Sequence, residues 1–219
     1  MKIIANIISY IFHPLFILVY IMGLALMFNP YMFQIADEKA KVTFYIYSIM
    51  SIVVMPLVVI VILKQVDIIK TWSMENRMER IGPLLIVGVL YLWLFINYKN
   101  TSSVPVIFTI FLLGSVISVF VSFFINNFTK ISLHTVGMGG MVAAIIILRF
   151  SLNYETLSLN LPFFGSYQIN SYFVLLFSII LAGLVGTFRL YLGSHTKDQV
   201  YFGYIVGFLA QILAYKIVM

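Results

Sequence analysis

The sequence contains no cysteine, and charged residues make up only 9% of its 219 positions. The absence of cysteine excludes disulfide bonds, thiolate nucleophiles and thiolate metal sites. Only seven residues are Asp or Glu, and they are spread along the chain without a His-x-x-x-His pair. A zinc or magnesium site needs more clustered ligands than this. We therefore expect no metal, no cofactor and no nucleic-acid partner.

Apolar residues, by contrast, fill 63% of the chain and raise its mean hydropathy to +1.09. Runs such as SIVVMPLVVIVIL are apolar on both faces, which excludes the alternating strands of a barrel and favours membrane helices. The sequence predicts an all-α, polytopic integral membrane helix bundle with six to seven transmembrane helices. It forms one membrane domain over residues 1–219. We expect helices at residues 8–29, 42–63, 82–97, 104–126, 132–149, 171–189 and 199–217.

The first apolar segment has no small-residue cleavage site, so we do not expect a cleaved signal peptide. Residues 1–10 either cross the membrane with it or lie in the interface. Polar interruptions at residues 29–41, 64–80 and 151–170 are interpreted as connections between helices.

Three clusters of ionisable residues stand between the apolar runs. They are KQVDIIKTWSMENRMERIGP at 64–83, KISLHTVGMGG at 130–140 and RLYLGSHTKDQVYFG at 189–203. They follow the second, fourth and sixth predicted helices, and alternate loops emerge on the same side of a membrane. We therefore expect these side chains to converge at one membrane face: Lys70, Arg77, Ser132, His134, Arg189 and His195.

Simpler interpretations exist for each feature taken alone. An isolated basic cluster is most often an interfacial anchor. His13, in FHPLF, is interpreted as a satisfied polar group beside a kink. The small residues of GMGGM predict a close helix-packing face rather than a phosphate loop, because they let membrane helices approach closely. The coincidence of three clusters on one face favours a site.

Arginine and lysine side chains bind phosphoryl oxygens, and arginine does so through two parallel hydrogen bonds. A neutral histidine nitrogen can attack phosphorus, and a second histidine can protonate the leaving oxygen. His195 and Gln199 are four residues apart and share a helical face, so Gln199 can orient the imidazole. Asp198 brings a negative charge but points about 100° away around the helix.

The third cluster resembles the third signature of the type 2 phosphatidic acid phosphatase superfamily: Ser-Arg, five residues, His, three residues, Asp. Arg189 and His195 have this spacing, with Tyr-Leu-Gly at 191–193. Phe188 replaces the serine before the arginine. Gln199 occupies the position of the relay aspartate, and Asp198 stands one residue early.

The segment ISLH is similar to the second signature of that superfamily, Pro-Ser-Gly-His. It keeps Ser132 and His134, whereas Ile131 and Leu133 replace the proline and the glycine. The resemblance covers about residues 40–217.

The first signature, Lys, six residues, Arg-Pro, is the least well matched. Lys70 and Arg77 have its spacing, but Arg80, with Pro83 shortly after, is a competing alignment for the arginine. The chain contains no Arg-Pro dipeptide.

The resemblance implies His195 as nucleophile and His134 as general acid, with Gln199 or Asp198 in the relay role. It implies phosphate binding by Lys70, Arg77 or Arg80, Ser132 and Arg189. It also implies metal-independent hydrolysis of a membrane lipid phosphate or diphosphate of the phosphatidate, phosphatidylglycerophosphate or undecaprenyl diphosphate class. The alternative is a family member that binds or transports anionic lipids without turnover, which Gln199 and ISLH favour.

The charge balance does not settle the orientation in the membrane. The cluster side carries more Lys and Arg than the other, which alone predicts a cytoplasmic site. The bias disappears when the proposed phosphate ligands are left out. Bacterial members of the family work at the outer face, so the resemblance implies a bacterial inner membrane with the site on the periplasmic side.

Overall fold

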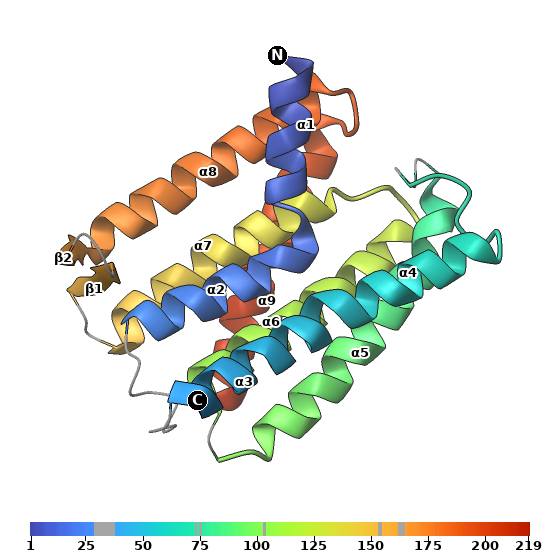
Figure 1. Ribbon diagram of the computed structural model, residues 1–219. Helices are drawn as coiled ribbons and strands as arrows, with labels where there is room; N and C mark the ends of the chain where they lie inside the picture. The colour runs from blue at the N-terminus through green and yellow to red at the C-terminus, as the bar shows by residue number, and fades with distance from the viewer. Residues whose placement is uncertain (29–37, 73, 75, 103, 153–154, 162–164) are drawn as a thin grey trace.

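The computed structural model describes residues 1–28, 38–72, 74, 76–102, 104–152, 155–161 and 165–219. In this part the chain is an all-α helix bundle with one small hairpin (Figure 1). The helices are α1 (Lys2–Ile11), α2 (Pro14–Phe28), α3 (Glu38–Ile49), α4 (Met55–Gln65), α5 (Ile81–Lys99), α6 (Val106–Asn126), α7 (Leu133–Leu152), α8 (Ser171–Tyr191) and α9 (Lys197–Val218). A π-helical turn, Met50–Val54, joins α3 to α4, and a 3₁₀ turn, Arg77–Arg80, precedes α5.

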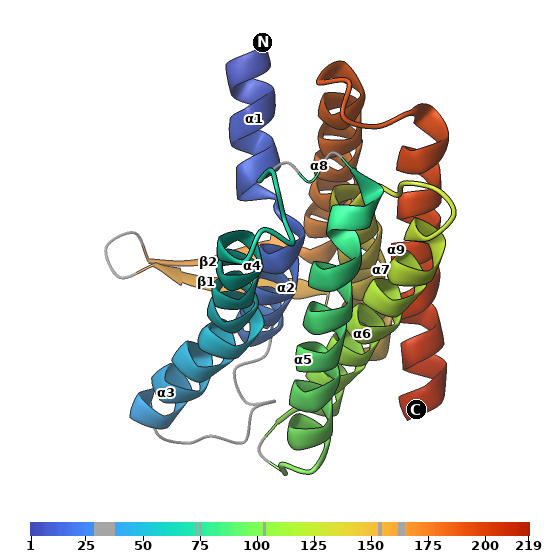
Figure 2. The same cartoon turned by 90° about the vertical axis from the view of Figure 1, so that its right-hand side faces the viewer.

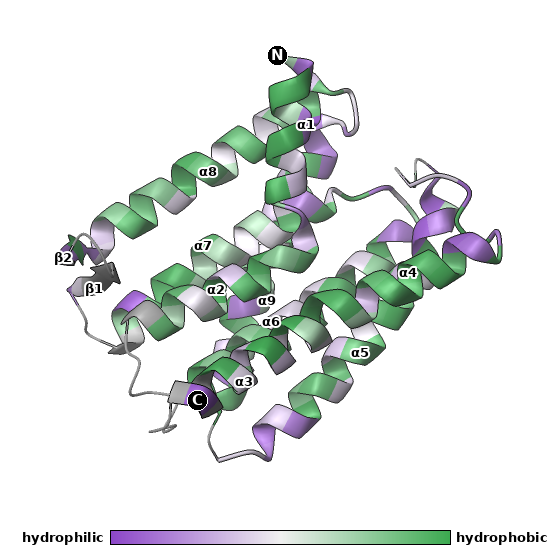
Figure 3. Ribbon diagram, in the orientation of Figure 1, coloured by the Kyte–Doolittle hydropathy of each residue, from purple (hydrophilic) through white to green (hydrophobic). Residues whose placement is uncertain are grey.

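Six helical segments of the described chain are long and apolar enough to cross a membrane. They are Val42–Gln65, Arg77–Lys99, Val106–Asn126, Leu133–Phe150, Ser171–Tyr191 and Lys197–Val218. Figure 3 shows apolar residues along the helices and polar residues gathered at their ends. The prediction of a multi-pass membrane helix bundle is therefore confirmed, as are six of the seven predicted helices.

The first predicted helix, residues 8–29, is wrong as a single element. The chain breaks between α1 and α2, and the two axes are bent by 58°. Pro14 causes the break, because its ring removes a backbone donor and disfavours helical geometry in the residue before it. If the bent pair is one span, the bundle has seven spans. Residue 29 and most of the expected interruption at 29–41 lie outside the described residues.

A hairpin replaces the expected plain connection at residues 151–170. Strands β1 (Thr156–Leu161) and β2 (Gly165–Asn170) pair antiparallel, and Thr156 lies opposite Asn170. The hairpin projects sideways from the bundle (Figure 2). It joins α7 to α8 at the end of the bundle opposite the three charged loops.

Helices α7 and α9 pack closely along a seam of glycines. A Cβ atom at Gly139 would collide with the backbone of Tyr204, and one at Gly207 would collide with the backbone of Val136. Small residues permit this approach, and close contact is what holds membrane helices together. The prediction that GMGGM is a packing face is confirmed for Gly139.

The loops that carry the three charged clusters lie at one end of the bundle (Figure 1). Hydrogen bonds tie them together. Arg77 Nη1 donates to the carbonyl of Asn127 at 3.0 Å, and the backbone N–H of Ser132 donates to the carbonyl of Gln199 at 3.3 Å. The expectation from loop parity is therefore confirmed at the level of the loops, although not for every side chain.

Candidate functional site

A cavity of about 1050 Å³ opens between α1, α2 and the helices from α4 to α9. At the loop end its wall carries five nitrogen-rich side chains: His13, Arg80, His134, Arg189 and His195. Its deepest polar residue, Gln211, lies about 21 Å along α9 from the first residue of that helix, at 1.5 Å per residue. Most of the lining between these levels is apolar and includes Ile17, Ile21, Leu57, Ile60, Leu84 and Val87.

His195 lies in the short loop between α8 and α9, where the start of α9 sets its orientation. Thr196 and Gln199 form a capping box at that helix start, and His195 Nδ1 lies 2.9 Å from Gln199 Oε1. An amide oxygen only accepts, so Nδ1 carries the proton and Nε2 keeps its lone pair. The expected contact between His195 and Gln199 is present.

His195 is only 8% exposed, and its surroundings keep it neutral. The pKa of His195 is lowered to about 4, chiefly by burial and also by the positive charges of Arg80, Arg189 and Lys130, while the hydrogen bond to Gln199 opposes them. Both effects disfavour the imidazolium form. At neutral pH the ring therefore presents an uncharged nitrogen to the cavity.

His134 is the second residue of α7, and its partner comes from α1. Its Nε2 lies 3.0 Å from the carbonyl oxygen of Ser9. A carbonyl only accepts, so Nε2 carries the proton and Nδ1 is the atom free to exchange one. The N-terminal helix thus orients a residue 125 positions away in sequence.

His13 is a third histidine of this wall, which the sequence interpretation missed. It stands at the kink as expected, but its ring also packs edge-on against that of His134, with centroids 5.6 Å apart. Its Nδ1 accepts a hydrogen bond from the backbone N–H of Leu15 at 3.4 Å, which leaves the proton on Nε2. The only local signal was a polar residue in an apolar run, and its neighbours depend on the fold.

Two arginines complete the polar end of the cavity. Arg80 is 7% exposed and donates through Nε to the carbonyl of Met74 at 2.9 Å and through Nη1 to the carbonyl of Ile131 at 3.1 Å. Arg189, in the last turn of α8, has a buried Nε without a hydrogen-bond partner among the described residues. No Asp or Glu is among the described residues that line the cavity. Two guanidinium groups without a carboxylate favour an anionic ligand.

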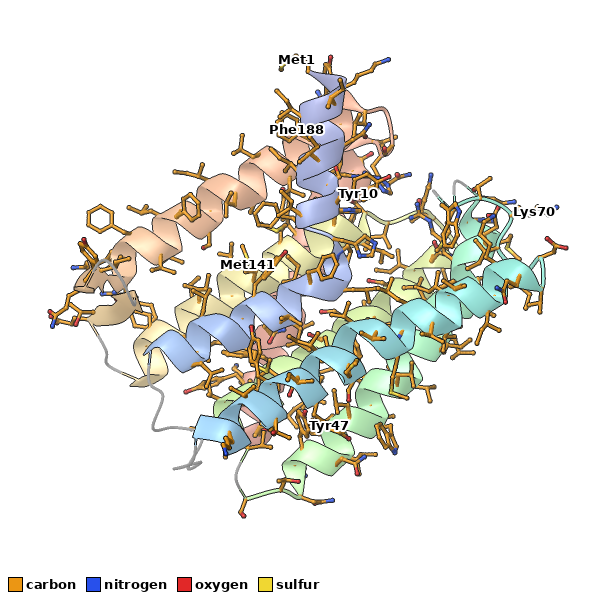
Figure 4. The ribbon with its side chains drawn as sticks, in the orientation of Figure 1. Met1, Tyr10, Tyr47, Lys70, Met141 and Phe188 are labelled. Atoms are coloured by element: carbon orange, nitrogen blue, oxygen red, sulfur yellow. The ribbon has the colours of Figure 1, made fainter. Side chains whose placement is uncertain are left out.

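Lys70 and Arg77 do not line the cavity. Lys70 is exposed, and Glu79 accepts a hydrogen bond from its backbone N–H at 3.1 Å. Figure 4 shows Lys70 at the outer end of the loop after α4, well separated from Tyr10 of α1. Arg77 donates to the carbonyls of Asn127 and Phe128 and so ties two loops together. Of the two competing alignments, the geometry therefore favours Arg80 over Arg77.

Ser132 and Asp198 also lie away from the cavity lining. Ser132 is fully buried, and its Oγ has no hydrogen-bond partner among the described residues. Its carbonyl lies against Gly203 of α9, where a Cβ atom would come within 2.8 Å of it. Asp198 is exposed in the first turn of α9, where its carboxylate interacts favourably with the positive end of the helix dipole.

Among the described residues, no group of three or more His, Asp and Glu side chains is arranged to hold a metal ion. The arrangement consists of two cationic side chains, three imidazoles and an apolar chamber behind them. No family model, no curated protein and no solved structure matches this chain, so its geometry and its sequence carry the functional argument.

Proposed function

We propose that the protein is a metal-independent phosphatase of membrane lipid phosphates or diphosphates. The observation that carries the proposal is one cavity that joins a cationic, histidine-lined end to an apolar interior. A lipid phosphate has the same division, with an anionic head and a hydrocarbon tail. The volume lies at the upper end of the range typical of ligand pockets.

Arg80 and Arg189 are suited to hold the phosphoryl group. Arg80 is buried and Arg189 is half-buried, and the described residues of the cavity wall include no carboxylate, so a phosphate supplies the missing negative charge. Guanidinium groups hold phosphate through paired, charge-assisted hydrogen bonds. The carbonyls of Met74 and Ile131 fix the Arg80 side chain before the ligand arrives.

The two hydrogen-bonded histidines supply a double-displacement reaction. The Nε2 lone pair of His195 attacks phosphorus and the P–O bond to the lipid breaks. His134 takes up a proton on Nδ1 when the anionic phosphate binds beside it, and gives that proton to the leaving oxygen. Neutral His134 then takes a proton from water, whose oxygen attacks the phosphohistidine. The P–N bond breaks, inorganic phosphate leaves, and both histidines return to their starting states.

A second candidate function is binding or transport of anionic lipids without turnover. Gln199 motivates it, because an amide orients His195 but brings no negative charge to stabilise the cation that forms on attack. The same cavity would hold the lipid in either case.

The deciding experiment measures phosphate release from dioleoyl phosphatidate by the purified protein, with and without a chelator. We expect release that survives chelation and is abolished in His195→Ala, because its Nε2 lone pair is the atom that forms the bond to phosphorus. His134→Ala should slow release by about 10²–10⁴, the range of general acid–base catalysis. Lys197→Ala, an exposed change two residues from His195 at the start of α9, is the control and should remain active. Lipid binding without release would favour the second candidate.

We place the protein in a bacterial inner membrane with the site facing the periplasm, on the resemblance to the phosphatase superfamily alone. Because the chain has no cysteine, a single Asp198→Cys change gives a clean label for this end. Labelling of intact cells by a membrane-impermeant thiol reagent is the expected result, and labelling only after lysis would reverse the orientation.

A further inference from the structure

Helix α1 turns a polar face toward the cavity. Asn6, Ser9 and Tyr10 follow the i, i+3, i+4 spacing of one face of α1, His13 follows in the break after the helix, and all four line the cavity. The opposite side carries exposed isoleucines, among them Ile7 at 51% exposure. An interfacial helix with this division lies with its apolar side in lipid and its polar side inward.

The hydroxyl of Ser9, in this wall, has no hydrogen-bond partner among the described residues. The residue is 7% exposed, and its Oγ is buried. A buried hydroxyl without a partner costs about 1–3 kcal/mol, so it is ordinarily satisfied. Because Ser9 lines the cavity, rotation of its side chain toward the cavity allows a ligand there to supply the acceptor.

The polar face of α1 adjoins the residue that would protonate the leaving group. The carbonyl of Ser9 holds His134 Nε2 at 3.0 Å, and the His13 ring packs against that of His134. On the proposed function, the leaving oxygen of the lipid lies beside His134. The Ser9 carbonyl occupies Nε2 and the leaving oxygen lies at Nδ1, so the atoms next to that oxygen lie in the cavity whose wall His134 shares with Asn6 and Ser9.

We propose that Asn6 and Ser9 form a subsite for the uncharged, hydrogen-bonding part of the lipid next to its phosphate. The lining residues of α1 include no Lys, Arg, Asp or Glu, so they suit neutral oxygens rather than a second phosphate. Ester carbonyls on a glycerol backbone are such oxygens, whereas a polyprenyl chain has none. The inference rests on the proposed function and narrows its substrate to ester-linked glycerol phospholipids.

The test compares dioleoyl phosphatidate with its diether analogue, which has the same chains but lacks the carbonyls. Each hydrogen bond contributes about 1 kcal/mol, so we expect wild-type kcat/KM to favour the ester by about fivefold or more. The double variant Asn6→Leu, Ser9→Ala should bring this ratio close to one. Ile7→Ala, on the exposed face of the same helix, should leave the ratio unchanged.

Three outcomes would overturn the subsite. They are equal kcat/KM for the two lipids in the wild type, an ester preference that survives the double variant, and hydrolysis of geranylgeranyl phosphate as efficient as that of phosphatidate. Failure of the proposed function looks different, because no phosphate is then released from any of the lipids. In that case native mass spectrometry of the retained ester and ether lipids measures the same ratio as an affinity. A ratio of one there also refutes the subsite.

Discussion

Arg149 and Arg189 each stand in the last turn of a membrane helix, at opposite ends of the bundle. The Arg149 side chain interacts with other residues of the protein. Its Nη1 donates to the Ser171 hydroxyl, and its guanidinium lies 3.2 Å from the centre of the Tyr172 ring. Arg189 instead lines the large cavity beside three histidines. The same residue type in the same helical position therefore ties α7 to α8 in one case and faces a ligand chamber in the other.

Replacing each arginine by alanine tests this contrast most strongly. Arg189→Ala should lower phosphate release by about 10²–10³, as does the loss of one preorganised donor to a developing charge. Arg149→Ala should leave release per folded molecule unchanged but lower the thermal unfolding temperature in detergent, because a cation–π contact and a charge-assisted hydrogen bond together contribute about 1–2 kcal/mol. Phosphate assays and thermal unfolding of both variants give the comparison. A large loss of activity in Arg149→Ala with an intact fold would contradict it.

A smaller effect is expected from the partner of His195. Gln199→Asp should raise the rate several-fold, because a carboxylate at this position accepts from Nδ1 and also stabilises the positive ring formed on attack. Asp198→Asn should have little effect, since Asp198 is exposed. Rates of the two variants at one pH on a short-chain phosphatidate are the measurement. A large loss in Asp198→Asn without a gain in Gln199→Asp would instead give the relay role to Asp198.

The smallest expected effect is on the pKa of His195. Its pKa is lowered to about 4, chiefly by burial, so the ring should remain neutral at pH 6 and take up a proton only near pH 4. In Gln199→Asp the added negative charge favours the protonated form, so the pKa should rise. Nitrogen-15 NMR of labelled histidine follows both titrations, and the signal is assigned by its absence in His195→Ala. A wild-type pKa near 6.5 would show that the cavity does not desolvate this ring.

The helices were predictable because they depend on local properties. A run of about 20 apolar residues is enough to form a membrane span, whatever its neighbours are. The contact of Gln199 with His195 was equally local, since a spacing of four residues places two side chains on one helical face. The hairpin at residues 156–170 was missed although its first strand, TLSLNL, alternates leucine with polar residues, because the whole segment was interpreted as a polar interruption between membrane spans.

Contacts between segments far apart in sequence decide which side chains line the cavity. Arg77 and Arg80 are the same residue type, three positions apart. Arg77 donates to the carbonyls of Asn127 and Phe128, whereas Arg80 lines the cavity. Spacing in sequence does not say which of two neighbouring side chains points into a space built by several helices.

By itself the sequence determined that this chain is a membrane helix bundle, that its charged loops meet at one end, and that His195 has Gln199 as its neighbour. Only the tertiary structure brought α1 over the cavity, placed His13 against His134, and left Lys70 exposed outside it. The reason is physical. Hydropathy and helical periodicity act over a few turns of one segment, whereas the kink at Pro14 and the packing of α1 set positions across 125 residues of chain.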